Sequence, residues 1–161
     1  MISVIRRADK PAGFTFIELL ISVTIMLILI GVSLPSLKKA LDNFGIENYA
    51  RNISYLGRYL QASSISEGKI YCMKVLPAEN KIFPFFIDGN NLQQKLSARM
   101  GREHLLPQGV KFLNPQDEEI VYFYPDGTAQ GGNISFANSY NSKISLLING
   151  ATGEIAIEQE K

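Results

Sequence analysis

A long apolar run follows a short polar segment at the start of the chain. Between Phe14 and Leu34, Glu18 is the only charged residue. About 20 apolar residues in a helix, at about 1.5 Å per residue, cross the roughly 30 Å hydrocarbon core of a bilayer. The run therefore predicts a helix that can span a membrane. It also contains one acid that a purely apolar span does not explain.

An amphipathic stripe comes after this run. Beyond Pro35, apolar residues recur every three to five positions, which is typical of one face of a helix. They are Leu37, Leu41, Phe44, Tyr49, Ile53, Leu56 and Leu60. Gly68 is well placed to end the helix. We interpret the stripe as a face that packs on the core of the chain's own domain.

The pattern changes to strands from Lys69 onward. Short runs rich in β-branched and aromatic residues alternate with Gly, Asn, Pro and Asp, which are turn formers. The runs are KIYCMKVL, KIFPFFI, VKFL, EEIVYFYP, GNISFA, KISLLIN and GEIAIEQ. They predict a mainly antiparallel sheet, in which Pro84 favours an edge strand or a bulge. The polar stretch from Leu92 to Pro107 is expected to form a loop, with room for a short helix.

Three interpretations of the apolar run are open from the residues alone. A cleaved secretory signal fits the basic residues before it, but the run is too long and no A-x-A-like site follows. A plain signal anchor explains the length, and Glu18 then lies near the membrane interface, where a carboxylate reaches water at low cost. The third interpretation starts from the spacing of Gly13, Phe14 and Glu18.

This spacing, after a short basic leader, resembles the type III signal of the type IV pilin superfamily. The resemblance implies that a prepilin peptidase cuts between Gly13 and Phe14 and methylates the new amino terminus of Phe14. It also implies that Glu18 docks the subunit, by neutralising the amino terminus of a neighbour. Each charge alone is costly to place in apolar surroundings, and pairing the two charges lowers this free-energy cost. Gly13 suits such a cut because it has no side chain to obstruct a protease.

Gly31 and Pro35 mark a weak point at the end of the apolar run. Pro35 has no N–H for the carbonyl of Gly31, and its ring crowds that carbonyl, so the helix is expected to bend or loosen there. In pilin-like filaments this part of the helix can melt on assembly. A simple kink, or a helix end at the membrane edge, is the other interpretation, and both stay open.

The C-terminal part resembles the GspH/FimT family of pilin-like proteins. The resemblance rests on a turn of the form F-x-P-D-G at Phe123–Gly127, a glycine-rich continuation, and a final hairpin of the form T-G-x-[IV]-x-[IV] that starts at Thr152. The stretch YARNISYLGRYLQASSISEGKIY resembles the family's helix before the first strand, although QASSIS departs from relatives that often carry charges there. The resemblance implies a pilin-like α+β fold, a long N-terminal hydrophobic and amphipathic helix packed on a C-terminal antiparallel β domain. The expected parts are a prepilin leader peptide (1–13), a transmembrane assembly helix (14–34), its amphipathic continuation (35–68) and a periplasmic β domain (69–161).

Composition argues against several other functions. The 161 residues are 46% hydrophobic and 19% charged, which fits one modest globular domain. From Lys69 to the end there are nine Lys and Arg against ten Asp and Glu, so the basic surface that nucleic acid requires is missing.

Cys72 and His104 are the only residues of their types, and no catalytic triad, metal-ligand cluster or phosphate loop is recognisable. The acidic triplet at 117–119 is typical of a solvated turn. We therefore expect no enzyme, no metal and no cofactor.

The expected function follows from the resemblance. It implies a minor pseudopilin of a type II secretion system, held by a single pass in the bacterial inner membrane with its C-terminal domain in the periplasm. Its implied partners are sister pseudopilins or pilins, the prepilin peptidase and an inner-membrane assembly platform. The alternative is a minor type IV pilin of the FimT/FimU kind, in pilus assembly or DNA uptake, although the acidic end GEIAIEQEK argues against DNA. A signal-anchored periplasmic enzyme or receptor is a third hypothesis, and it requires Met1 to Gly13 to stay attached.

Overall fold

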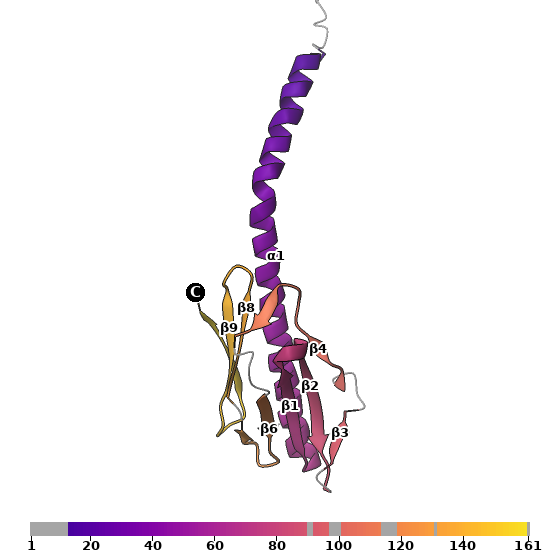
Figure 1. Cartoon of the computed structure of the whole chain (residues 1–161), viewed down its shortest axis with the longest axis vertical. Helices are drawn as coiled ribbons and strands as arrows, with labels where there is room; N and C mark the ends of the chain where they lie inside the picture. The colour runs from indigo at the N-terminus through magenta and orange to yellow at the C-terminus, as the bar shows by residue number, and fades with distance from the viewer. Residues whose placement is uncertain (1–12, 90–91, 97–100, 114–118, 131, 161) are drawn as a thin grey trace, which may run out of the picture. The chain divides into compact units, whose positions relative to one another are not determined.

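One long helix and two antiparallel sheets make up the structure (Figure 1). The computed structural model describes residues 13–89, 92–96, 101–113, 119–130 and 132–160, with the side chains of residues 35 and 160 excepted. The helix α1 extends from Phe16 to Glu67. The chain divides into two compact units, Met1–Lys38 and Lys39–Lys161, so α1 contributes to both. We describe each unit by itself.

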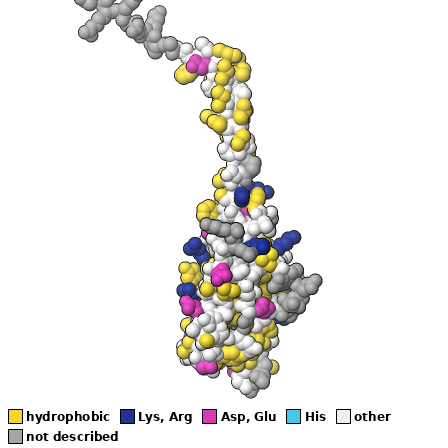
Figure 2. Space-filling model, turned by 90° about the vertical axis from the view of Figure 1, so that its left-hand side faces the viewer, with side chains coloured by type: hydrophobic (Ala, Val, Ile, Leu, Met, Phe, Trp, Pro, Cys, Tyr) yellow, Lys and Arg dark blue, Asp and Glu magenta, His cyan; other side chains and the backbone are white. Residues whose placement is uncertain are grey.

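The first unit is an apolar helical segment with its side chains exposed. Figure 2 shows hydrophobic side chains along this part of α1, and between Phe14 and Leu34 each large apolar residue is at least 48% exposed. The hydroxyls of Ser22, Thr24 and Ser33 donate to the carbonyls of Glu18, Leu20 and Leu29, four residues earlier. These bonds satisfy polar groups that lipid cannot. By length and composition alone, α1 qualifies as a membrane-spanning helix.

The second unit contains a six-stranded sheet, which we call sheet A. Its order is β3-β2-β1-β6-β7, and β4 also pairs with β2. All pairs are antiparallel. The strands are β1 (Ile70–Leu76), β2 (Lys81–Ile87), β3 (Gln93–Lys95), β4 (His104–Leu105), β6 (Glu119–Phe123) and β7 (Ala129–Gln130). A short 3-10 helix, η1 (Pro77–Glu79), joins β1 to β2.

A four-stranded sheet, sheet B, completes the second unit. Its order is β10-β9-β8-β5, again antiparallel throughout. The strands are β5 (Val110–Phe112), β8 (Asn133–Asn138), β9 (Lys143–Ile148) and β10 (Ile155–Glu160). The tight turns before β7, β9 and β10 match the turn residues of the sequence, with positive φ at Gly127, Asn141 and Gly153 respectively.

The core lies between the C-terminal half of α1 and both sheets. Ile53, Leu56 and Leu60 of the helix are almost fully buried, in one cluster with side chains of sheet A and sheet B. The ring of Tyr49 packs edge-on against Phe136 of β8, with ring centroids 5.4 Å apart. The predicted fold class is therefore present: one long N-terminal helix packed on antiparallel β structure.

The predicted core stripe of the helix is wrong at its N-terminal end. Leu37, Leu41 and Phe44 are 56%, 60% and 62% exposed, and the buried face begins at Ile46. Helical periodicity shows that these residues share a face, but it does not show what covers that face. In this chain the sheets cover only the part of the stripe from Tyr49 onward. Within the second unit, Leu41 and Phe44 are therefore exposed apolar residues about one helical turn apart.

The predicted loop at Leu92–Pro107 is wrong in part, and its residues 97–100 lie outside the described residues. It contains β3 and β4, and both pair with the outer edge of β2. β4 pairs with residues 81–82 and β3 with residues 85–87. Pro84 lies between the two contacts, at a point where β2 has no outer partner among the described residues. At Pro84, β2 is therefore paired on one side only within the described ranges, as in an edge strand, and this is the position that proline requires. Residues 81–82 and 85–87 of β2 are paired on both sides.

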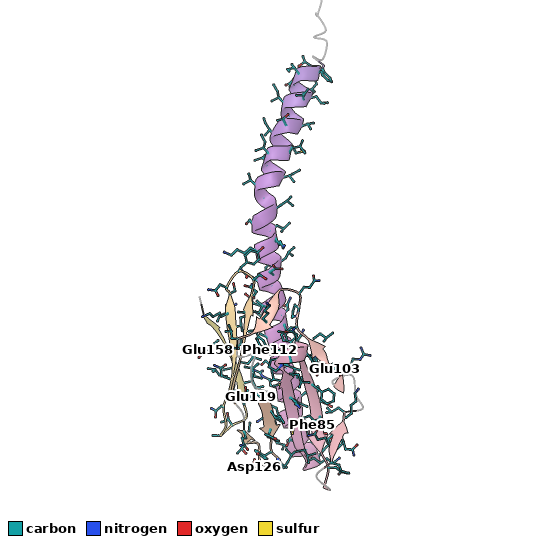
Figure 3. The ribbon with its side chains drawn as sticks, in the orientation of Figure 1. Phe85, Glu103, Phe112, Glu119, Asp126 and Glu158 are labelled. Atoms are coloured by element: carbon teal, nitrogen blue, oxygen red, sulfur yellow. The ribbon has the colours of Figure 1, made fainter. Side chains whose placement is uncertain are left out.

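Two family-like turns meet at the C-terminal end of α1. The side-chain amide of Gln61 donates to the carbonyls of Gly127, in the PDG turn, and Thr152, in the final hairpin. The buried hydroxyl of Ser64 donates to the carbonyl of Phe123 on β6, at 2.9 Å. The stretch QASSIS therefore supplies neutral donors that fix both turns to the helix, where a charged side chain would be costly to bury. Within the PDG turn, Asp126 accepts from the hydroxyl and the N–H of Thr128, which lowers the pKa of its carboxyl (Figure 3).

Replacing Gly153 with alanine is expected to lower the free energy of unfolding by about 2 kcal/mol or more. Gly153 has φ 65, and a Cβ there would contact the amide of Gln61 and lie 2.7 Å from the carbonyl oxygen of Gly127. Urea denaturation of the purified chain in detergent, followed by near-ultraviolet circular dichroism, measures the change. Gly45→Ala is the control, because Gly45 lies in the helix with open space around it, and this change is expected to be neutral or stabilising. Equal stability of the two variants would contradict the packing described.

Candidate functional site at the start of the N-terminal helix

The predicted site residues Gly13, Phe14 and Glu18 lie together at the beginning of α1. Thr15 caps the helix, since its hydroxyl oxygen accepts from the N–H of Glu18 at 3.3 Å and its carbonyl accepts from the N–H of Leu19 at 3.2 Å. The sequence Thr15 to Glu18 has the spacing of a capping box, of which the threonine half is formed. The helix therefore starts at a defined point just after Phe14.

The capping geometry adds an explanation of Glu18 that the sequence pattern did not suggest. Glu18 is in the first turn, where the positive end of the helix dipole favours an acid. Its side chain is exposed, and its carboxylate has no hydrogen-bond or ion-pair partner within the part of the chain that the structure describes. Glu18 can thus support the helix start and still present a negative charge to another molecule.

Gly13 and Phe14 precede the helix in open surroundings. A Cβ at Gly13 would meet no atom within 4 Å, and Phe14 is 84% exposed. The peptide bond between them lies in non-helical chain, outside the hydrogen-bonded ladder of α1. Nothing among the described residues hinders access of a protease to this bond.

Gly31 and the backbone of Pro35 lie inside α1, which the structure describes as helical from Phe16 to Glu67. A Cβ at Gly31 would meet open space. The expected kink or melting at this pair stays a prediction, because melting concerns the assembled subunit.

The other residues singled out in the sequence have structural surroundings. Cys72 is fully buried in β1, and burial raises the pKa of its thiol to about 12, which keeps it protonated and unreactive at neutral pH. His104 lies in β4, where its backbone carbonyl accepts from the hydroxyl of Tyr49 at 2.9 Å. Glu119 accepts from the N–H of Gly132, while residues 117 and 118 lie outside the described residues. Within the described ranges no three His, Cys, Asp or Glu side chains gather as metal ligands do.

Comparison with known protein families identifies a match at the N-terminus of the chain. Residues 9–34 match the family model described as the prokaryotic N-terminal methylation motif. No curated protein sequence matches the chain significantly.

Two solved structures of the minor pseudopilin EpsH from the type 2 secretion system of Vibrio cholerae are similar in fold. The first has a TM-score of 0.60 at 11% identity, and covers 71% of this chain and 97% of its own. The second has a TM-score of 0.57 at 9% identity, and covers 74% and 94%. At such identities the likeness is one of fold.

The N-terminal motif match and the similar solved structures both support predictions made from the sequence. The match at residues 9–34 contains Gly13, Phe14 and Glu18, and it coincides with the apolar start of α1. The predicted pilin-like fold and the resemblance of the N-terminus to a prepilin signal are confirmed. A methylation motif followed by an apolar helix indicates a membrane-anchored chain with a soluble C-terminal domain. The chain thus combines the prokaryotic N-terminal methylation motif with a fold similar to that of the minor pseudopilin EpsH.

Proposed function

We propose that the chain is a minor pseudopilin of a type II secretion system. It assembles with sister pseudopilins near the tip of a periplasmic pseudopilus that drives export of folded proteins across the outer membrane. The observation that carries the proposal is the joint occurrence of the methylation motif at residues 9–34 and a fold similarity that covers 97% of the chain in the solved structure of the minor pseudopilin EpsH. The chain acts by assembly and catalyses no reaction itself.

The proposed maturation starts at the exposed bond before the helix. A prepilin peptidase cuts after Gly13 and methylates the amino group of Phe14. The exposed, non-helical position of this bond supports the assignment. Removal of residues 1–13 takes away Arg6, Arg7 and Lys10, and leaves one new positive charge at Phe14.

In the filament, the carboxylate of Glu18 neutralises the amino terminus of a neighbouring subunit. An unpaired ion costs several kcal/mol in apolar surroundings, so a cation and an anion that are buried together each need the other. The carboxylate is exposed in the single chain and has no partner among the described side chains, which leaves it available for this contact.

The exposed residues Leu41 and Phe44 of the second unit support assembly along the helix. They are 60% and 62% exposed, and the chain's own sheets do not cover them. Exposed apolar side chains that are grouped on a folded subunit are typical of a protein interface. We assign these two residues to contacts with neighbouring helices. Loosening at Gly31 and Pro35 then lets the two parts of α1 adjust to these contacts.

The proposed location is the bacterial inner membrane, with a single pass and the C-terminal domain in the periplasm. The partners are sister pseudopilins, the prepilin peptidase and an inner-membrane assembly platform. The apolar start of α1 and the methylation motif support the membrane anchor.

Site-specific crosslinking in the native host tests the function. A photo-crosslinking residue in place of Phe44, which is 62% exposed, is expected to capture secretion pseudopilins. The same residue in place of the buried Leu56 is the control, and it should capture no partner. Capture of type IV pilus subunits instead would favour the minor-pilin alternative. Capture of neither class would contradict both.

A further inference from the structure

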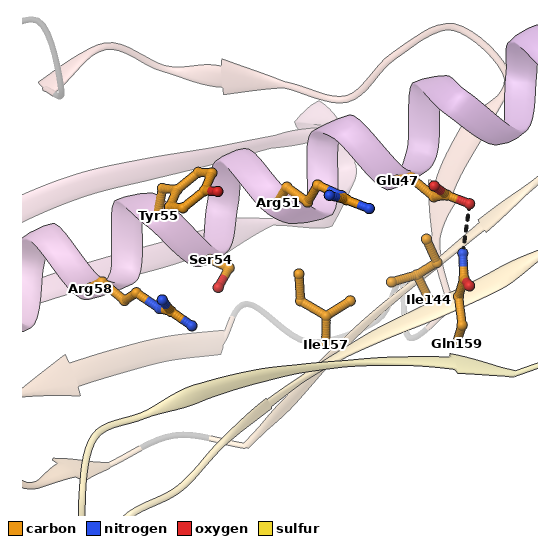
Figure 4. A pocket seen from close by; sticks show the side chains of 8 residues that line it. All are labelled: Glu47, Arg51, Ser54, Tyr55, Arg58, Ile144, Ile157 and Gln159. Carbon is orange, nitrogen blue, oxygen red and sulfur yellow. Dashed lines mark hydrogen bonds between the residues drawn. The ribbon is translucent and has the colours of Figure 1, made fainter.

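A groove of about 370 Å³ opens in the second unit between α1 and the last two strands of sheet B (Figure 4). Arg51, Tyr55 and Arg58 line it from the helix, and Ile157 lines it from β10. At one end the amide of Gln159 donates to the carboxylate of Glu47, at 2.8 Å, and joins the two walls. The helix wall thus carries two arginines, with Glu47 at the bridged end, and the strand wall carries Ile144 and Ile157.

The helix wall carries polar groups without partners. Arg51 and Arg58 are exposed, and neither guanidinium has an ion pair or hydrogen bond among the described residues. Ser54 lies between them in the sequence and lines the same groove. Two exposed cations on one wall, both without partners in the described part of the chain, favour an anionic ligand from another molecule.

The strand wall has a free edge. β10 pairs with β9 on one side only, because it is the terminal strand of sheet B. Its other edge has no strand partner among the described residues, so a row of backbone N–H and C=O groups is available for pairing. Ile157 is 42% exposed and Tyr55 is 61% exposed, so both present apolar surface beside that edge. Edges of this kind bind extended peptides by strand addition.

From these features we infer that the groove binds an extended acidic segment of another polypeptide, added to sheet B as a further strand beside β10. The side chains of the segment that point toward the helix lie on the same side of sheet B as Ile157, and carboxylates there contact Arg51 and Arg58 beside Tyr55. The alternate, apolar residues of the segment point to the opposite face of the sheet. The two arginines are seven residues apart, so they lie about 10 Å apart along the helix. Side chains on one face of a strand repeat every 7 Å or so, which flexible arginine arms can match. The inference does not depend on which filament the chain joins.

A binding experiment with the full chain in detergent micelles tests this inference. The probe is a short fluorescent peptide in which valine alternates with glutamate, and fluorescence anisotropy gives its dissociation constant. The unaltered chain is expected to bind the peptide, more weakly at high salt because the contacts are ionic. The double change Arg51→Ala and Arg58→Ala is expected to weaken binding about tenfold or more. The matched control is Lys111→Ala, since Lys111 is an exposed cation on β5, at the opposite edge of the same sheet.

Two further probes separate strand addition from charge attraction alone. A peptide with alternate backbone amides N-methylated keeps its carboxylates but cannot pair with β10, and it is expected to lose binding. A peptide with glutamine in place of glutamate is expected to bind about as weakly as the unaltered peptide binds the double variant. No binding to the unaltered chain would overturn the inference. Equal binding to the double variant, equal binding of the N-methylated peptide, or tighter binding of a single-stranded oligonucleotide would overturn it as well.

Discussion

Gly13→Trp is expected to leave the chain in the membrane as an uncleaved precursor, with no detectable mature product. The prepilin peptidase must bring its catalytic groups to the carbonyl of Gly13, and an indole at this position blocks the approach that a missing side chain allows. Folding of the chain itself should not suffer. A Cβ at Gly13 meets nothing within 4 Å, and the residue precedes both the helix and its cap. Immunoblotting of membranes from the native host distinguishes the precursor from the shorter mature form.

Gly13→Ala is the matched control for processing. Alanine adds only one methyl group in the same open position, so we expect cleavage to continue. If Gly13→Trp yields mature product at the normal rate, the cut does not depend on a small residue at this position. The proposed cleavage site would then be wrong.

Glu18→Ala is expected to enter the membrane normally and to fail in assembly. Removal of the acid makes the apolar run more uniform, so insertion is unchanged or improved. In the filament the amino terminus of a neighbour loses its counter-ion. Breaking a buried ion pair by removing one partner costs about 3–5 kcal/mol, so incorporation is expected to fall about a hundredfold or more. Quantitative crosslinking to neighbouring subunits measures incorporation.

Glu18→Gln distinguishes the docking charge from the helix cap. Glutamine retains the length of the side chain and can occupy the same position of a capping box opposite Thr15. It cannot neutralise an amine. If Glu18 serves only to start α1, Glu18→Gln assembles like the unaltered chain. If its charge docks a neighbour, Glu18→Gln fails as Glu18→Ala does, and this is the result that we expect.

Much of the fold could be predicted from the sequence because its local signals are strong. The apolar run and the stripe beyond it predict one long helix, which is present as α1. The longer strands and their Gly, Asn and Asp turns are also where the residue pattern places them. Pairing between distant segments is the part that the pattern does not contain. β3 and β4 were missed because they are two or three residues long and exist only through their contacts with β2.

Burial along the helix was predictable only in part. Leu41 and Leu56 belong to the same periodic stripe, yet the first is 60% exposed and the second 1%. Which of them is covered depends on where the sheets end, and that is a property of tertiary structure. Tertiary structure also explains Gly57, a glycine in the interior of α1. In the fold, a Cβ there would contact Ile155 of β10, so the helix and the strand approach each other at this glycine.

The candidate site was more predictable than the groove. Gly13, Phe14 and Glu18 are close in sequence, so a short pattern contains them all, and the motif match includes them. Arg51 and Arg58 look like the solvated face of a helix when read alone. They become notable only when β10, about a hundred residues later, places its free edge beside them. The donor role of Gln61 was missed for the same reason, since its two acceptors come from separate turns.

The mass of the intact protein, purified from its native membrane, shows whether the chain is processed as a prepilin. We expect a chain that has lost residues Met1 to Gly13, begins at Phe14 and carries one added methyl group. A single mass measurement records both changes, and fragmentation assigns the methyl group to the amino terminus. A chain that keeps its first thirteen residues, or one cut at another bond, would show that Gly13 and Phe14 are not the processing site.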